Sequence, residues 1–303
     1  MTIQISELTN KHLPIVVGLL NGEYRNSYEF IPFDEERILS QIRQRRLKVL
    51  VAEENGDVLG LIGTHTHAEE HSEKHVSWLA AREGHNRRAV ESILVSEIEK
   101  DAKGSDVMTM IDKGSPRIND WVDRGYSLYP GFQRMSATLD GSKPIPELAQ
   151  GARLRSLRLD EEEKLVTVMN AGFGWQRIEL GVLEIWKSED PPFSEEWVQV
   201  AEIDERIVSA VVARPDTDYM KYLHLKRGHL GPAATLPEFR NKHLGTALTA
   251  RAMNFLFERG MNSVRLGTSE QNVSSIALLR SLGFQVDIVT KILRKDLKSA
   301  LPA

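Results

Sequence analysis

A short basic segment of the chain has the composition of an anion-binding turn. Arg240 and Lys242 precede Gly245, and apolar residues then recur at helical spacing from Leu244 to Leu256. The first backbone N–H groups of a helix have no intrahelical partner and lie at the positive end of the helix dipole. The segment therefore predicts a helix over residues 243–259 whose N-terminus binds a diphosphate. The alternative is a surface helix with a basic entry.

Composition narrows the function classes. The chain has 303 residues, 41% of them hydrophobic and 27% charged, which is typical of a soluble protein with two domains. It contains no cysteine, which excludes disulfides, thiolate metal sites and a cysteine nucleophile. The net charge of −4 and the lack of a basic aromatic surface disfavour nucleic acid. The first residues do not form a signal peptide, and no apolar run could cross a bilayer, so we expect a cytoplasmic protein without a membrane partner.

Two sequence echoes indicate an internal duplication. Residues 49–63 align with residues 198–212 without a gap, and each stretch is typical of a β-hairpin. Residues 121–126 parallel residues 279–284 in the same order, about one domain apart. Because one echo could arise by chance whereas two in order are harder to explain, duplication is the better interpretation.

The duplication divides the chain into an N-terminal domain, a linker and a C-terminal domain. The expected ranges are 1–140, 141–150 and 151–303, the linker being rich in glycine and proline. Each half alternates strands and helices around a hairpin, which predicts an α/β (α+β) fold with a mixed central sheet flanked by helices. In the second half we expect strands at 152–157, 227–236, 263–268 and 284–293, and helices at 161–170, 178–187, 243–259 and 273–282.

The basic segment resembles the acetyl-CoA-binding motif of the GNAT superfamily of N-acetyltransferases, R/Q-x-x-G-x-G/A. Arg240 stands at the first position, His243 where the first glycine usually is, and Gly245 at the last. Residues 272–284 are similar to the family's N-x-x-A-x-x-L-Y-x-x-x-G-F segment. The resemblance covers about residues 151–296. Two tandem domains with a catalytic second copy also resemble mycothiol synthase-like enzymes, an analogy of architecture.

The resemblance implies two GNAT-type domains, each with a partly splayed sheet, and a function as an acetyl-CoA-dependent N-acetyltransferase. The acyl group would pass directly to a primary amine of a small molecule or peptide, with no metal, in a monomer or homodimer. The alternative is a non-catalytic module that binds acyl-CoA or a partner. The residues expected to bind acetyl-CoA are Ala233, Thr235, Leu236, Arg240, Asn241, Lys242, His243, Leu244, Gly245, Thr246 and Asn272.

The resemblance also suggests the chemistry of proton transfer. His229 falls where some relatives carry a catalytic glutamate, and histidine suits a general base at neutral pH. The alternative is a strand histidine without a chemical role, and His224 and Glu270 are weaker candidates. Leu279 replaces the tyrosine that protonates the departing thiolate in many relatives, which leaves water or Ser275 for that step.

A left-handed backbone at His243 would cost roughly 1–2 kcal/mol, so we expect a helical conformation there. In such folds the loop between the first two helices builds the acceptor pocket. Here that loop contains Phe173 and Trp175, whose alternative role is packing.

The first copy has a degenerate counterpart of the basic segment. Aligned on Arg82, its final glycine position is Arg87, whose side chain would occupy the space that a diphosphate needs. Arg87 and Arg88 could still attract phosphates, but a structural role for this copy is favoured. His65, His67, His71 and His75 lie close in sequence, yet their spacing is no known zinc signature, so no metal is expected.

Overall fold

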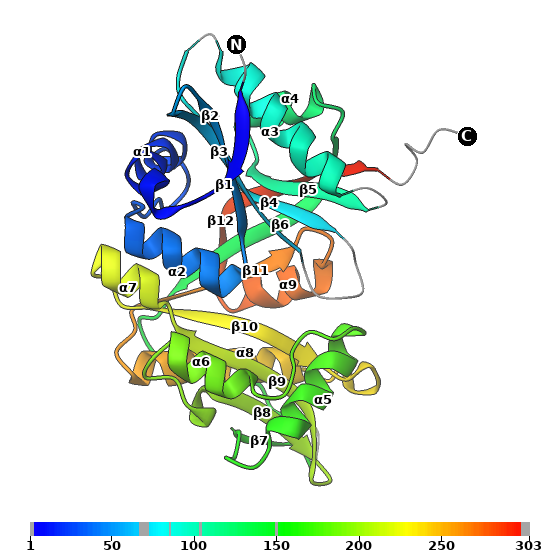
Figure 1. Cartoon of the computed structure of the whole chain (residues 1–303). Helices are drawn as coiled ribbons and strands as arrows, with labels where there is room; N and C mark the ends of the chain where they lie inside the picture. The colour runs from blue at the N-terminus through cyan, green and yellow to red at the C-terminus, as the bar shows by residue number, and fades with distance from the viewer. Residues whose placement is uncertain (1–2, 67–72, 85, 103–104, 149–150, 298–303) are drawn as a thin grey trace. The chain divides into compact units, whose positions relative to one another are not determined.

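The computed structural model describes residues 3–66, 73–84, 86–102, 105–148 and 151–297. The chain divides into two compact units, which are shown in Figure 1. Unit 1 comprises Met1–Gly131 and Ile288–Ala303, and unit 2 comprises Phe132–Asp287.

Unit 1 is a mixed sheet with helices on its faces. Its strand order is β1-β2-β3-β4-β5-β12, and all neighbours are antiparallel except β4 and β5. The elements are β1 (Gln4–Glu7), the 3-10 helix η1 (Asn10–His12), α1 (Leu13–Tyr24), α2 (Glu35–Arg45), β2 (Lys48–Glu54), β3 (Asp57–Thr66), β4 (Lys74–Ala81), α3 (Arg87–Asp101), β5 (Asp106–Asp112), α4 (Arg117–Val122), the first residues of β6 (Ser127–Thr138) and most of β12 (Gln285–Asp296).

Two apolar clusters hold the helices of unit 1 to its sheet. Leu20 on α1 and Ile38 on α2 are fully buried, and they belong to the same cluster as Trp78 of β4. Leu94 on α3 and Trp121 on α4 belong to the other. Since neighbouring residues of a strand point to opposite faces, each face of the sheet buries its own apolar set.

Unit 2 repeats this order. Its strands run β6-β11-β10-β9-β8-β7, with β10 and β11 as the parallel pair. The elements are β7 (Arg153–Ser156), α5 (Glu162–Phe173), α6 (Val182–Glu189), η2 (Glu195–Trp197), β8 (Val198–Ile203), β9 (Arg206–Pro215), α7 (Thr217–Leu223), β10 (Arg227–Thr235), η3 (Pro237–Phe239), α8 (Leu244–Glu258), β11 (Ser263–Ser269), α9 (Val273–Ser281) and β12 (Gln285–Asp296).

The last strand of each half of the sequence completes the sheet that the other half forms. Residues 132–138 of β6 pair with β11 in unit 2, whereas residues 290–296 of β12 pair with β5 in unit 1. The compact units therefore differ from the sequence ranges 1–140 and 151–303 by an exchange of strands. The division of the sequence into two repeats and a linker stays a prediction.

Helix α8 is the central helix of unit 2, and its sequence explains its length and position. Leu248, Ala252 and Leu256 recur at helical spacing and are fully buried against the sheet. Gly260 follows with φ of 75°, a conformation that suits glycine after the last turn. The predicted α/β fold with mixed, partly splayed sheets flanked by helices is confirmed. Helix α7 was not predicted.

Candidate functional site

The parallel strands of unit 2 part immediately after His229. Strand β10 pairs with β11 only from Arg227 to His229, and β11 then continues alone on that side. On its other side, β10 skips Gly231 and Pro232 and resumes pairing with β9 at Ala233. Proline cannot donate to a sheet ladder, which explains the interruption. The gap leaves the side of β10 that faces β11 without a strand partner after His229, where an extended ligand can pair with it.

Helix α8 presents its N-terminus after a tight turn. Asn241 and His243 have φ values of 62° and 58°, so both are left-handed. The expectation of a helical backbone at His243 was therefore wrong. The turn must reverse the chain between the end of β10 and the start of α8, and a left-handed residue at the N-cap achieves this at a cost of roughly 1–2 kcal/mol. Such turns direct successive N–H groups to one point, which favours an anion.

The two predicted phosphate cations have different surroundings. Arg240 is exposed, and its guanidinium donates to the carbonyl oxygens of Gly172 (2.8 Å) and Thr235 (3.4 Å). This side chain links the end of α5 to the end of β10. The Lys242 ammonium is exposed and lies 4.8 Å from the centre of the Phe239 ring. Lys242 therefore remains accessible to a phosphate beside α8.

Other residues predicted to contact acetyl-CoA lie around this turn, but not all offer their side chains. Leu236 and Leu244 are buried in the core, so only their backbone groups could contact a ligand. Gly245 leaves the first turn of α8 narrow, since a Cβ there would lie 3.2 Å from Leu278. The Asn272 carboxamide caps α9 by accepting from the N–H of Ser275 at 3.2 Å. Contact of these residues with acetyl-CoA stays a prediction.

His229 lies in a row of basic side chains. The register places Arg265 of β11 beside it and Arg214 of β9 on its other side. Because paired residues of neighbouring strands project on the same face, the side chains of Arg214, His229 and Arg265 lie side by side in that order. Both Arg265 and Arg227 share the carboxylate of Asp216, at 2.6 and 2.7 Å. Cations therefore outnumber the carboxylates that pair with them here.

This environment lowers the pKa of His229 to about 3, through burial first and then the charges of Arg214, Arg265 and Arg227. Its Nδ1 atom is buried and has no hydrogen-bond partner among the described residues. At pH 7 the imidazole is neutral, which is the form that accepts a proton, but it is a weak base. A general base works best when its pKa lies near the working pH.

The predicted acceptor loop follows α5. The rings of Phe173 and Trp175 are 5.8 Å apart at 75°, and both are exposed. Arg177 lies over both rings, 5.6 and 5.5 Å from their centres. The side-chain oxygen of Asn170 accepts from the backbone N–H of Arg177 (2.7 Å) and of Ile178 (3.0 Å), which fixes the loop. The aromatic pair is thus a support for a guanidinium, and its contact with an acceptor stays a prediction.

Further candidates for proton transfer are less well placed. Leu279 is 4% exposed in the core, so the side chain at this position of α9 is aliphatic and buried. His224 ends α7 and is exposed, and Glu270 follows β11. Ser275 lies in the first turn of α9, half-buried.

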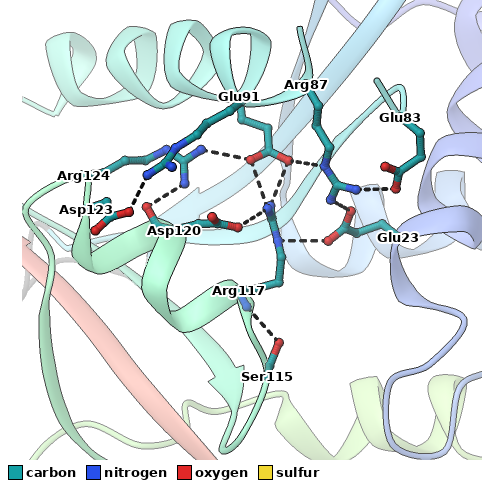
Figure 2. A network of polar contacts seen from close by, with 10 residues as sticks. Glu23, Glu83, Arg87, Glu91, Ser115, Arg117, Asp120, Asp123 and Arg124 are labelled. Atoms are coloured by element: carbon teal, nitrogen blue, oxygen red, sulfur yellow. Dashed lines mark hydrogen bonds and ion pairs between the residues drawn. The ribbon is translucent and has the colours of Figure 1, made fainter. Parts of the chain in front are cut away.

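The first copy fills the corresponding helix N-terminus with ion pairs, as Figure 2 shows. Arg87, the first residue of α3, pairs with Glu23, Glu83 and Glu91. Arg88 pairs with Asp123 at 2.5 Å. The cations that could have attracted phosphates therefore already have carboxylate partners.

Glu91 is the centre of this network and is 1% exposed. It accepts from Arg87 (3.0 Å), from Arg117 (3.0 and 3.1 Å) and from Arg124 (2.9 Å). Burial alone would raise the pKa of Glu91, but the hydrogen bonds and charges of Arg117 and Arg87 hold it below its usual range. The buried carboxylate is thus fully paired, and the network supports a structural role for α3.

The histidine cluster shows no metal site in the described part of unit 1. The rings of His65 and His75 are stacked 5.1 Å apart, and His65 Nδ1 lies 2.9 Å from the hydroxyl of Ser77. His67 and His71 lie outside the described residues. Within the described residues, no three His, Cys, Asp or Glu side chains are grouped to hold a metal ion.

Sequence reasoning missed Arg177, Arg214 and Arg265. Two of them are adjacent to His229 only through strand register, and the bulge at Gly231 and Pro232 makes that register hard to predict. Arg177 had a visible signal, because it follows the aromatic pair by two residues.

Comparisons with known proteins define the class of protein. Residues 154–284 match the Acetyltransferase (GNAT) family, which agrees with the parted strands and open helix N-terminus of unit 2. The match spans less than half of the chain, and it confirms the predicted resemblance of the second half to the GNAT family. No helix in the described residues is long and apolar enough to span a membrane.

Particular relatives extend the likeness. A mycothiol acetyltransferase of Renibacterium salmoninarum is 24% identical over 173 residues, which cover 53% of this chain and 49% of that protein. A GCN5-related N-acetyltransferase from Sphaerobacter thermophilus has a TM-score of 0.74 at 16% identity, covering 97% of this chain and 96% of that one. A tandem GNAT protein from the clavulanic acid biosynthesis pathway has a TM-score of 0.68 at 14% identity, with both chains covered completely.

The sequence relatives and the structural relatives cover different shares of the chain. The chain spans about half the length of the curated relatives it matches. The two structural likenesses concern the fold alone, which this chain shares with both proteins over nearly its whole length.

Proposed function

We propose that unit 2 transfers an acetyl group from acetyl-CoA directly to a primary amine. The observation that carries the proposal is the parting of β10 from β11 beside the open N-terminus of α8. The parted edge of β10 offers hydrogen-bonding groups to an extended amide-containing arm, and the helix N-terminus with Lys242 offers N–H groups and charge to a diphosphate. One ligand that has both parts is acetyl-CoA.

The reaction requires an uncharged amine. The amine nitrogen attacks the carbonyl carbon of the thioester, a C–N bond forms, the C–S bond breaks, and CoA leaves as a thiolate. The amine loses a proton during this step, and the thiolate takes one up. His229 is proposed to accept the proton of the amine, since its imidazole is neutral at pH 7 and lies where the strands part. Water or Ser275 is proposed to protonate the thiolate.

Two observations favour a second candidate, a module that binds acyl-CoA without turnover. The buried Leu279 offers no acid, and His229 is a weak base before ligands bind. Both features slow catalysis but leave binding intact.

Turnover separates the two candidates. Isothermal titration measures acetyl-CoA binding, and CoA release across a panel of primary amines, with mass spectrometry of the products, measures transfer. The proposal predicts binding and amine-dependent release of CoA. Binding without any acetylated product would establish the module instead. His229→Ala is expected to lower kcat at least tenfold, as is typical when a general base is removed, and an unchanged rate would exclude it as the base.

A further inference from the structure

A cavity of about 380 Å³ opens in unit 2 beside the bulge of β10. Two guanidinium groups line it, one from the loop after α5 and one from the end of β9. Apolar side chains of α6 and of the loop before it form much of the remaining wall. The lining residues that matter here are Arg177, Arg214, Leu180, Ile185, Trp186 and Pro232.

Arg177 is a cation without a counterion. It pairs with no carboxylate among the described residues, and its guanidinium instead rests on Phe173 and Trp175. Burial of the guanidinium, and then the charge of Arg214, hold the pKa of Arg177 below its usual range, and both arginines line the same cavity. The aromatic faces stabilise a guanidinium while they leave its N–H donors free to bind an anion.

Arg214 is partly neutralised. Its guanidinium pairs with Asp190 at 3.0 Å and lies over the ring of Trp186, but its Nε atom is buried without a hydrogen-bond partner in the described part of the chain. Glu179 also lines the cavity, and its carboxylate accepts from Gln176 at 2.9 Å. A carboxylate in the wall repels a doubly charged group more than a singly charged one, so a ligand carboxylate fits better than a phosphate.

The cavity adjoins His229. Arg214 is its cross-strand partner, and Pro232 of the cavity wall follows Gly231, where a Cβ would lie 3.6 Å from Nε2 of His229. An anion bound to Arg214 therefore lies close to the imidazole. Burial is the main reason that the pKa of His229 is low, and the negative charge of the ligand would offset the further lowering by the arginines, so the imidazole would become a stronger base when the ligand is present.

We propose that this cavity receives the acceptor and that Arg177 and Arg214 bind a carboxylate on it. The substrate class is then a small primary amine that carries both a carboxylate and an apolar group, of which an apolar amino acid is the simplest example. This inference rests on the proposed acetyl transfer and names its acceptor.

The test uses the full chain and matched acceptors. Phenylalanine, leucine and methionine are each compared with their amides and with the amines that lack the carboxyl group, and CoA release is measured with saturating acetyl-CoA. We expect kcat/KM to be at least tenfold higher for an amino acid than for its amide, since a charge-assisted hydrogen bond to a carboxylate is roughly twice as strong as a neutral one.

Arg177→Gln is the informative variant, because Arg177 pairs with no carboxylate among the described residues and its removal therefore leaves no buried carboxylate unpaired. We expect KM for the amino acid to rise roughly tenfold or more, KM for acetyl-CoA to stay the same, and the preference over the amide to disappear. Arg153→Gln is the matched control, because Arg153 is exposed on the edge strand β7, two strands away from β9, and does not line the cavity, so it should change none of these values.

The outcomes separate this inference from the proposed function. Amides that are acetylated as well as amino acids, or an Arg177→Gln effect on acetyl-CoA alone, would overturn the carboxylate site and leave acetyl transfer standing. Acetyl-CoA binding without acetylation of any amino acid in the panel would also overturn it. If acetyl-CoA does not bind, the proposed function fails first.

Discussion

The ion-pair network around Glu91 makes a quantitative prediction about unit 1. Replacing Glu91 by glutamine keeps the size of the side chain but removes the charge that the three guanidinium groups of Arg87, Arg117 and Arg124 share. The new amide also turns an NH₂ group toward cations that can only donate. The variant therefore leaves buried charge without compensation rather than merely deleting a contact.

The cost follows from burial. Glu91 is 1% exposed and accepts four hydrogen bonds from arginines. Removing one partner of a buried ion pair typically costs about 3–5 kcal/mol. Because each 1.4 kcal/mol is about a factor of ten, the local opening equilibrium of α3 should rise by roughly 100-fold or more.

Hydrogen exchange of the α3 amides measures this opening directly, without requiring the two units to unfold together. Protection in α3 should fall by about two orders of magnitude in Glu91→Gln. Glu97→Gln on the same helix is the control, because that half-buried carboxylate pairs with Lys100 at 3.1 Å and with no other cation among the described residues, and about 0.5 kcal/mol is expected. If the two variants lose equal protection, the reasoning about buried charge is refuted.

Two further predictions concern unit 2. Hydrogen bonds from Arg155 lower the pKa of the buried Glu161 to about 2 although burial opposes this, so the stabilisation is complete above about pH 4.5 and is lost as pH falls toward 2. In Glu161→Gln the free energy of unfolding should no longer show this decrease between about pH 4.5 and pH 2, which is on the order of 2 kcal/mol. Gly228→Ala places a Cβ 2.5 Å from Leu256 and should destabilise unit 2 by about 1–3 kcal/mol in urea, whereas Gly267→Ala, with open space around its Cβ, should cost about 1 kcal/mol or less.

Local signals account for what the sequence predicted well. The apolar spacing of α8 acts within a few residues, so the helix could be placed from the sequence. The same holds for the start of β11 at Ser263 and of α9 at Val273, which the structure confirms.

Non-local pairing accounts for what the sequence did not predict. The exchange of β6 and β12 depends on which sheet edge is free, and strand composition does not encode that. The row formed by Arg214, His229 and Arg265 depends on register across a bulge. At His243 the geometry of the turn outweighed the steric preference of the residue, which local propensity cannot anticipate.

The central claim is that the N-terminus of α8 binds the diphosphate of acetyl-CoA, and one pair of variants tests it. Thr246 is the third residue of α8, and Ala89 is the third residue of α3. An aspartate at either position favours the helix dipole, so the helix is retained. Beside a diphosphate, however, a unit charge about 5 Å away at an effective dielectric constant of about 20 costs about 3 kcal/mol.

Isothermal titration with acetyl-CoA is the direct measurement. The account predicts one site per chain, at least a 30-fold weaker affinity in Thr246→Asp, and unchanged binding in Ala89→Asp. Equal affinity in Thr246→Asp and the parent chain, or a loss confined to Ala89→Asp, would contradict it.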